Sequence, residues 1–135
     1  MSKIVGGCLC GKIRYTGTTD PVMTAICHCK NCQKQAGTAF SVIVAVPKTT
    51  LTISGPLKTY NETGSSGKPV HRNFCPECGS PITTDVEVMP DLVFIKAGTL
   101  DDTSWLQPSL EIWCRSAQSW TPAIPGAQRL DRGPS

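Results

Sequence analysis

The stretch Cys27-His28-Cys29-Lys30-Asn31-Cys32 places three thiols within six residues. Two close pairs of cysteines frame it, Cys8-Leu9-Cys10 before it and Cys75-Pro76-Glu77-Cys78 after it. Cysteines paired so closely are typical of metal ligands, because one turn can present two thiolates to the same ion. We therefore expect seven of the eight cysteines to bind two zinc ions around which the chain folds, with Cys114 standing alone.

The composition favours a mainly β protein with one short helix. The chain of 135 residues is the size of one domain, and its 12 glycines and 11 prolines indicate many turns and short elements. Residues 12–16 alternate between polar and apolar side chains like a half-buried strand, whereas residues 40–46 form the apolar run of a buried strand. Residues 29–36 have a helix-compatible composition, and Gly37 is suited to end that helix.

The same signals predict the remaining strands and the limits of the domain. Short apolar or alternating runs predict strands at residues 22–26, 50–54, 57–60, 70–74, 82–84, 92–96 and 110–114. We expect residues 1–120 to form one zinc-binding domain. Residues 121–135 contain three prolines and no hydrophobic period, so we expect a draped or frayed tail there.

The charge pattern gives little support for a nucleic-acid or membrane partner. The formal charge of +3 counts every thiol as neutral, and seven zinc-bound thiolates with two zinc ions would cancel it. No run of Lys and Arg interleaved with aromatic residues is present, so we expect no nucleic acid. No apolar stretch approaches the ~20 residues of a membrane span, and the first residues lack the apolar segment of a signal peptide. We therefore expect a cytoplasmic protein.

A reducing cytoplasm favours thiols that bind metal. Disulfide bonds are the alternative, although a Cys-x-Cys pair cannot easily bridge to itself. A redox site at Cys75-x-x-Cys78 is a further alternative, but the sequence Cys-Pro-Glu-Cys-Gly around it is typical of a zinc-binding turn.

The outer cysteines have the number expected of a structural zinc site. On extended backbone, Cys8 and Cys10 would present both sulfurs on the same side. Cys75 and Cys78 form a compact turn, and the glycine that follows permits the positive φ such turns often need. Together the four complete a closed tetrahedral site, which would fix the N-terminal strand to the middle of the chain.

The triplet Cys27, Cys29 and Cys32 is then one ligand short. Three protein ligands and one open position are the pattern of a catalytic zinc site. Because thiolates are strong donors, such a zinc is a mild Lewis acid, and it suits a soft ligand such as a substrate thiolate held at the open position.

Two residues could close the fourth position. Cys114 lies in an expected strand, where a free cysteine is commonly a small buried hydrophobe. His28 should face away from the sulfurs of its two neighbours if the backbone is extended, which favours a packing or hydrogen-bonding role. If Cys114 completes the triplet, both ions are structural and the case for an enzyme loses its centre.

The combined pattern resembles the glutathione-dependent formaldehyde-activating family, whose domain also occurs in centromere protein V. The resemblance covers about residues 3 to 120. The matching segments, in chain order, are Cys8-Leu9-Cys10-Gly11, Cys27 to Cys32, Gly37, Phe74-Cys75-Pro76-Glu77-Cys78-Gly79-Ser80 and Gly98-Thr99-Leu100-Asp101. Many members carry His-Ile near the C-terminus, where this chain has Glu111-Ile112, and Trp120 matches the tryptophan that follows.

The resemblance implies a β-tent fold of small coiled sheets and the same division of metals, with Cys8, Cys10, Cys75 and Cys78 on a structural zinc. It places Cys27, Cys29 and Cys32 on a catalytic zinc. The founding activity of the family joins formaldehyde to glutathione to give S-hydroxymethylglutathione, which is a carbon–sulfur lyase reaction in the synthetic direction.

We therefore expect a zinc-dependent carbon–sulfur lyase-type enzyme that acts on glutathione or a similar small thiol and an aldehyde-type electrophile. Lys30, Lys34 and Arg14 are candidates for contacting the carboxylates of glutathione, although exposed basic residues are usually solvated surface. The alternative is a non-catalytic, zinc-stapled binding module whose triplet zinc is closed or absent and whose surface recruits a partner.

Overall fold

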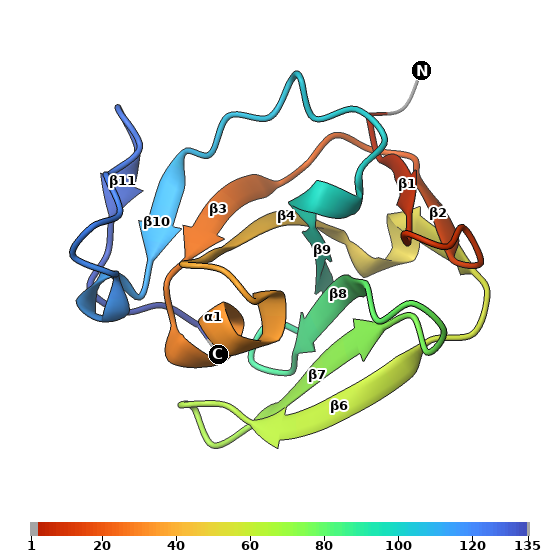
Figure 1. The fold of residues 1–135 in the computed structure, drawn as a ribbon, viewed down its shortest axis with the longest axis horizontal. Helices are drawn as coiled ribbons and strands as arrows, with labels where there is room; N and C mark the ends of the chain where they lie inside the picture. The colour runs from red at the N-terminus through yellow and green to blue at the C-terminus, as the bar shows by residue number, and fades with distance from the viewer. Residues whose placement is uncertain (1–2, 135) are drawn as a thin grey trace.

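The protein folds into two β-sheets and one α-helix in a computed structural model that describes residues 3–134 (Figure 1). The smaller sheet has the strand order β1-β2-β5, and the larger has the order β11-β10-β3-β4-β9-β8-β7-β6. The smaller sheet is made of β1 (Val5–Gly7), β2 (Arg14–Gly17) and β5 (Leu51–Ser54). The larger is made of β3 (Met23–Cys27), β4 (Ser41–Pro47), β6 (Lys58–Thr63), β7 (Pro69–Phe74), β8 (Pro81–Val86), β9 (Leu92–Lys96), β10 (Leu110–Ile112) and β11 (Gln128–Arg129).

The mainly β architecture with a single short helix, expected from the sequence, is confirmed for the described residues. The helix α1 spans Lys30–Ala36; Cys29 is its N-cap, and Gly37 ends it with a φ of 69° in the left-handed region. Short 3-10 helices cover Lys48–Thr50, Ala97–Thr99 and Cys114–Ser116. The strand β1 and the two-residue strand β11 were not predicted.

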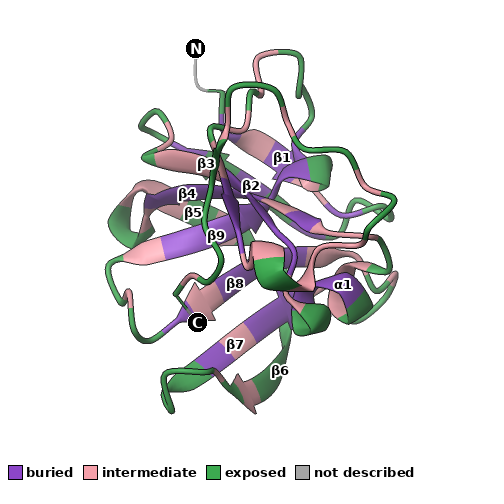
Figure 2. Ribbon diagram, turned by 90° about the vertical axis from the view of Figure 1, so that its left-hand side faces the viewer, coloured by how far each residue is buried: buried purple, intermediate pink, exposed green. Residues whose placement is uncertain are grey.

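The centre of the larger sheet is buried on both faces, as the purple strands of Figure 2 show. Side chains of β4 alternate between the faces, because successive residues of a strand point in opposite directions. Val44 and Val46 pack with Ile13 and Tyr15 of the smaller-sheet side. On the opposite face, Ile43 belongs to a separate apolar cluster with side chains of β7, β8 and β9.

The two sheets are joined by polar contacts as well as by this core. The Arg14 guanidinium on β2 donates to both carboxylate oxygens of Asp101, at 2.9 and 2.5 Å. The Tyr15 hydroxyl lies 2.7 Å from the hydroxyl of Thr99. The stretch around residues 98–101 therefore holds the smaller sheet against the larger one.

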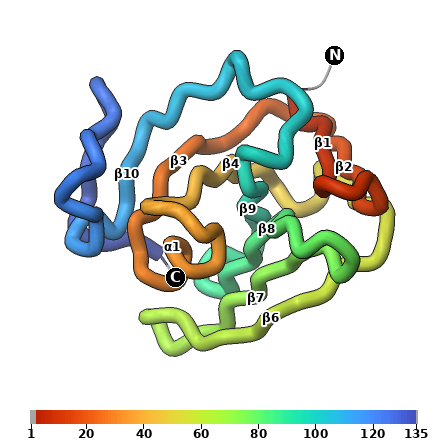
Figure 3. Tube along the Cα trace, viewed as in Figure 1, coloured from red at the N-terminus to blue at the C-terminus, as the bar shows by residue number. Residues whose placement is uncertain are grey.

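The chain then crosses the molecule to the far edge of the larger sheet. Figure 3 shows the segment after β9 passing along the top to β10. There β10 pairs in parallel with β3, placing Ile112 beside Cys27, and on its other side β10 pairs with β11. The last described residues return toward α1 (Figure 1), and Gly133 packs so closely on Ile112 that an added Cβ would lie 2.9 Å from the Ile112 Cβ. Both contacts connect the segment after residue 120 to β10.

Candidate metal centres and the cavity beside them

Cys8, Cys10, Cys75 and Cys78 come together between the two sheets. Their four sulfurs lie within 4.8 Å of one another. The Cys8 and Cys10 sulfurs are 3.5 Å apart, and those of Cys10 and Cys75 are 3.8 Å apart. A tetrahedral zinc with Zn–S bonds of about 2.3 Å requires sulfurs about 3.8 Å apart, so this set of donors fits the ion.

The backbone brings these sulfurs together in a different way from that expected. Cys8 follows β1 and Cys10 lies in a turn, in which the Gly11 amide donates to the Cys8 carbonyl at 3.2 Å. The expectation that the pair lies on extended backbone is therefore wrong, and the turn makes the two sulfurs converge. At the other half of the cluster, bonds from Ser80 lower the pKa of the Cys78 thiol to about 5, which favours the thiolate that a metal needs.

Cys27, Cys29 and Cys32 form the second cluster, where β3 passes into α1. Cys27 ends β3, Cys29 caps the helix and Cys32 lies in its first turn. Their sulfurs are also within 4.8 Å of one another. The Cys32 amide donates to the Cys29 sulfur at 3.3 Å, so the helix cap itself orients one of the three sulfurs.

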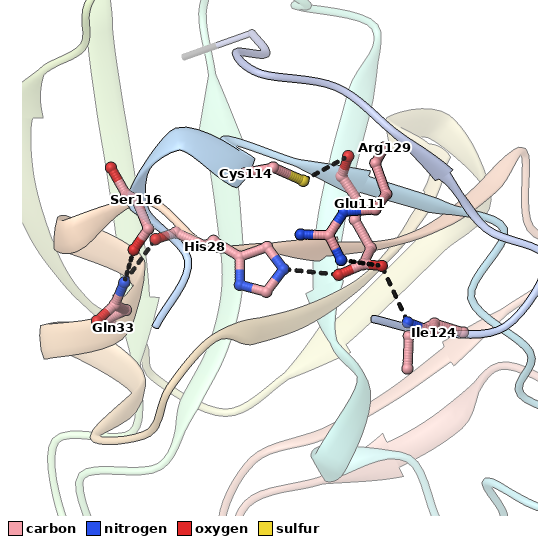
Figure 4. Close-up of polar contacts among 7 residues, drawn as sticks. All are labelled: His28, Gln33, Glu111, Cys114, Ser116, Ile124 and Arg129. Atoms are coloured by element: carbon pink, nitrogen blue, oxygen red, sulfur yellow. Dashed lines mark hydrogen bonds and ion pairs between the residues drawn. The ribbon is translucent and has the colours of Figure 1, made fainter. Parts of the chain in front are cut away.

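Neither candidate for a fourth ligand joins this triplet. Among residues 3–134, Cys114 groups instead with His28 and Glu111, and its sulfur lies 3.6 Å from the Glu111 carbonyl oxygen. His28 is 1% exposed and points from the backbone of the triplet toward Glu111 (Figure 4). The prediction that His28 has a hydrogen-bonding role is confirmed. Cys114 is only half-buried and follows β10 instead of lying within it, so the expectation of a cysteine buried in a strand is wrong.

Glu111 is the centre of a buried polar network behind the triplet. Its carboxylate accepts hydrogen bonds from His28 Nε2 at 2.8 Å, from the Ile124 amide at 3.0 Å and from Arg129 at 3.3 Å (Figure 4). Burial alone would raise the pKa of Glu111, but these bonds hold the pKa below its ordinary value. His28 lies between Cys27 and Cys29, and its amide also donates to the Ile112 carbonyl at 3.0 Å. Through His28, the network therefore holds the backbone of the triplet against β10.

Two buried cations beside the triplet were missed in the sequence. Arg72 on β7 and Lys96 on β9 are each 5% exposed. Arg72 Nη1 lies 3.7 Å from the Cys32 sulfur, and Nη2 donates to Glu62 at 3.1 Å. Lys96 donates to the Ser41 hydroxyl at 2.8 Å. The sequence offered a signal for Lys96 alone, a basic residue at the end of an apolar strand, because Arg72 stands among the polar residues His71 and Asn73.

These cations favour the thiolate form of Cys32. Hydrogen bonds from the Cys27 and Cys29 thiols, and after them the charges of Lys96 and Arg72, hold the pKa of Cys32 well below its ordinary value despite its burial. A zinc ion on three thiolates carries a net charge of −1, which adjacent cations stabilise. The chemistry of the donors and their surroundings therefore fits a bound metal.

A cavity of about 260 Å³ opens beside the triplet. All three cysteines line it, together with Arg72 and Lys96. Most of its remaining wall is apolar and comes from Met23, Ile43, Val70, Val86, Met89, Phe94, Leu110, Ile112, Leu130 and Pro134. A second, more polar hollow lies on the other side of Cys29, Arg72 and Trp113, and Lys30 and Asn31 line it.

Trp113 separates the two hollows and has an unusual backbone. It is the one non-glycine residue with positive φ in residues 3–134, at φ 56° and ψ 39°. A bulky residue in the left-handed region costs roughly 1–2 kcal/mol and is held there only by its surroundings. Such strain is commonly found at functional sites, and Trp113 lines both hollows.

Fold and site together define a mainly β domain with two cysteine clusters suited to metal. The family model of the glutathione-dependent formaldehyde-activating enzymes (GFA) matches residues 3–116, and the chain belongs to this family. All eight cysteines are free thiols in this structure. No helix among the described residues is long and apolar enough to cross a membrane.

Individual relatives are distant. A protein of Podospora anserina named "Putative glutathione-dependent formaldehyde-activating enzyme" is 27% identical over 132 residues, covering 90% of this chain and 60% of the relative. A protein of the same name from Aspergillus flavus is 28% identical over 106 residues, or 75% of this chain and 55% of the relative. The chain thus spans little more than half the length of these relatives. A Rhodobacter sphaeroides protein of known crystal structure shares the fold, with a TM-score of 0.58, 16% identity and coverage of 78% of this chain and 92% of that one.

Proposed function

We propose that this protein is a zinc-dependent carbon–sulfur lyase-type enzyme acting on glutathione, or a similar small thiol, and an aldehyde. The observation that carries the proposal is the triplet of Cys27, Cys29 and Cys32, which lies on a cavity wall with no fourth protein ligand beside it in residues 3–134. Zinc held by three thiolates lowers the pKa of a thiol that binds at its open position. Cys8, Cys10, Cys75 and Cys78 would hold a second, structural zinc.

In the reaction, the sulfur of the thiol forms a bond with the carbonyl carbon of the aldehyde. The carbon–oxygen double bond becomes a single bond, and the proton lost by the thiol ends on that oxygen. Arg72 and Lys96 are placed to stabilise the negative charge that moves from sulfur to oxygen. Because both cations are buried and held by Glu62 and Ser41, they need little reorganisation as that charge develops.

The polar hollow beside Cys29 is our candidate for the peptide part of the thiol. Of the three basic residues considered from the sequence, Lys30 lines this hollow. Arg14 lies on the smaller sheet and is paired there with Asp101. Lys34 is not part of the lining of the hollow. A carboxylate of glutathione would find Lys30 at this surface, where the Asn31 amide already donates to Glu62 at 3.1 Å.

The test compares thiol-dependent aldehyde consumption by the native protein, Cys29→Ser and Cys114→Ser. Cys114 is the matched control, because it is a cysteine outside both clusters. We expect Cys29→Ser to lose the activity and about half of the bound zinc, while Cys114→Ser keeps two zinc ions per chain and its activity. Equal rates for native protein and Cys29→Ser would remove the triplet from the chemistry. One zinc per chain in the native protein would favour the non-catalytic binding module.

A further inference from the structure

We propose that the apolar part of the triplet cavity binds the nonpolar substituent of the carbonyl substrate, so that this enzyme prefers hydrophobic aldehydes to formaldehyde. This inference rests on the proposed function, because it assigns the second substrate of that same site. Three features of the cavity support it: polar and apolar lining residues lie at opposite ends, buried hydrogen-bond donors lack partners, and the volume is large.

The reactive groups gather at one end of the cavity. On β3, Cys27 and Met23 both line it and are four residues apart, which is about 13 Å along a strand. The register of the sheet places Ile112 beside Cys27. Lys96 donates to Ser41, which lies opposite Cys27 across β3 and β4. Arg72 lies near Cys32, so both cations belong to the cysteine end.

The other end of the cavity is apolar. Two residues before Lys96 on β9, and therefore on the same face, lies Phe94. Two residues before Arg72 on β7 lies Val70, which pairs with Val86 at the end of β8. Met23 and Met89 also pack against this cluster of side chains. A bound molecule would thus meet thiolates and cations at one end and only hydrocarbon and thioether groups at the other.

Three hydrogen-bond donors on lining residues have no partner among residues 3–134. They are Nε of Arg72, the hydroxyl of Thr84 and the indole nitrogen of Trp113, all of them buried. Arg72 and Thr84 are direct neighbours across β7 and β8. Buried donors are rarely left unsatisfied, so an oxygen of a ligand is a fitting acceptor for them. A carbonyl or hydroxyl group followed by a nonpolar substituent has this arrangement of atoms.

The cavity has room for more than a one-carbon substrate. A dry cavity of roughly 150 Å³ is sufficient for benzene, and this one measures about 260 Å³. Formaldehyde would leave the apolar end empty. Each methylene group that enters it should instead improve binding by roughly fourfold, until the cavity is filled.

The first experiment needs no variant. We would measure kcat/KM of the zinc-loaded protein with glutathione and formaldehyde, propanal, pentanal or heptanal, corrected for the uncatalysed reaction. Binding of unreactive pentan-1-ol would be followed in parallel by titration calorimetry. We expect kcat/KM to rise from formaldehyde to pentanal by tenfold or more, and pentan-1-ol to bind and to compete with pentanal.

The second experiment fills the cavity. Val86→Phe places a ring in the apolar end, whereas Val88→Phe, two residues further on, adds the same ring at a side chain that is 37% exposed and outside the lining. We expect Val86→Phe to abolish pentan-1-ol binding and the preference for pentanal over formaldehyde, and Val88→Phe to change neither. Melting temperatures would confirm that both variants fold.

The results separate this inference from the proposed function. Formaldehyde turnover equal to or faster than that of pentanal, or no binding of pentan-1-ol, would overturn the apolar subsite and leave the lyase proposal standing. Absence of thiol-dependent turnover for every aldehyde would overturn the proposed function and with it the choice of aldehyde. Binding of pentan-1-ol that Val86→Phe abolishes would in that case still support an apolar binding site beside the triplet.

Discussion

The chain contains two histidine–glutamate pairs of similar geometry that differ in burial, and this allows a quantitative test of the network behind the triplet. His28 and Glu111 are joined at 2.8 Å with side chains that are 2% and 1% exposed. His71 and Glu87 are joined at 2.7 Å with side chains that are 32% and 50% exposed. We predict that Glu111→Ala is far more damaging to folding than Glu87→Ala.

The expected magnitudes follow from solvent access. Breaking a buried ion pair or charged hydrogen bond by removing one partner costs about 3–5 kcal/mol, because the other partner stays buried without compensation. Glu111→Ala also leaves the Ile124 amide without its acceptor, whereas Arg129 is 40% exposed and can turn to water. We therefore expect a loss of about 4 kcal/mol. The exposed pair should contribute less than about 1 kcal/mol.

The assay is urea unfolding of both variants at pH 7, with zinc content matched to the native protein. Glu111→Gln is a useful third variant, because its amide oxygen can still accept from His28 Nε2 while its amide nitrogen faces a donor. We expect it to lose about 2 kcal/mol, between the two alanine variants. A difference of less than about 1 kcal/mol between Glu111→Ala and Glu87→Ala would refute the reasoning from burial.

Three further predictions concern the rest of the fold. Gly37→Ala should destabilise the protein by about 1 kcal/mol in urea, because Gly37 ends α1 in the left-handed region, whereas Gly98→Ala, with open space and no positive φ, should not. Arg14 holds the pKa of Asp101 below its ordinary value, so their pair stabilises the fold above about pH 4 and this contribution is lost as pH falls through the lowered pKa. The stability deficit of Asp101→Asn should accordingly be largest near neutral pH and shrink in acid; a pH-independent deficit would contradict this. Removing metal with a strong chelator should lower the melting temperature, because the four-cysteine cluster links segments 65 residues apart; an unchanged melting temperature would exclude a structural ion.

The sequence is most informative where the signal is local. The helix was predictable because its cap, its composition and Gly37 lie within one short stretch. The orientation of His28 was predictable because alternation along an extended chain is a local rule. The strand β1 was missed because a run of three residues ending in two glycines carries little periodicity.

The surroundings of the triplet could not be predicted, because they depend on pairings between distant strands. Arg72 and Lys96 read as ordinary basic residues until the register of β7, β8 and β9 places them beside Cys32. The partner of His28 is 83 residues away, on a strand whose parallel pairing with β3 has no local signature. The cavity is the product of all these pairings, and its apolar character is spread over many strands.

The two cysteine clusters also differ in the order in which a ribosome would deliver their members. Cys27, Cys29 and Cys32 leave the ribosome almost together, so the triplet can capture an ion while most of the sheet is still unmade. Cys8 and Cys10 must wait for Cys75 and Cys78, since their cluster joins segments separated by a long loop. The triplet would thus be able to bind its ion before the four-cysteine cluster does. The walls of its cavity, with β10 among the last, would then fold around an ion that is already bound.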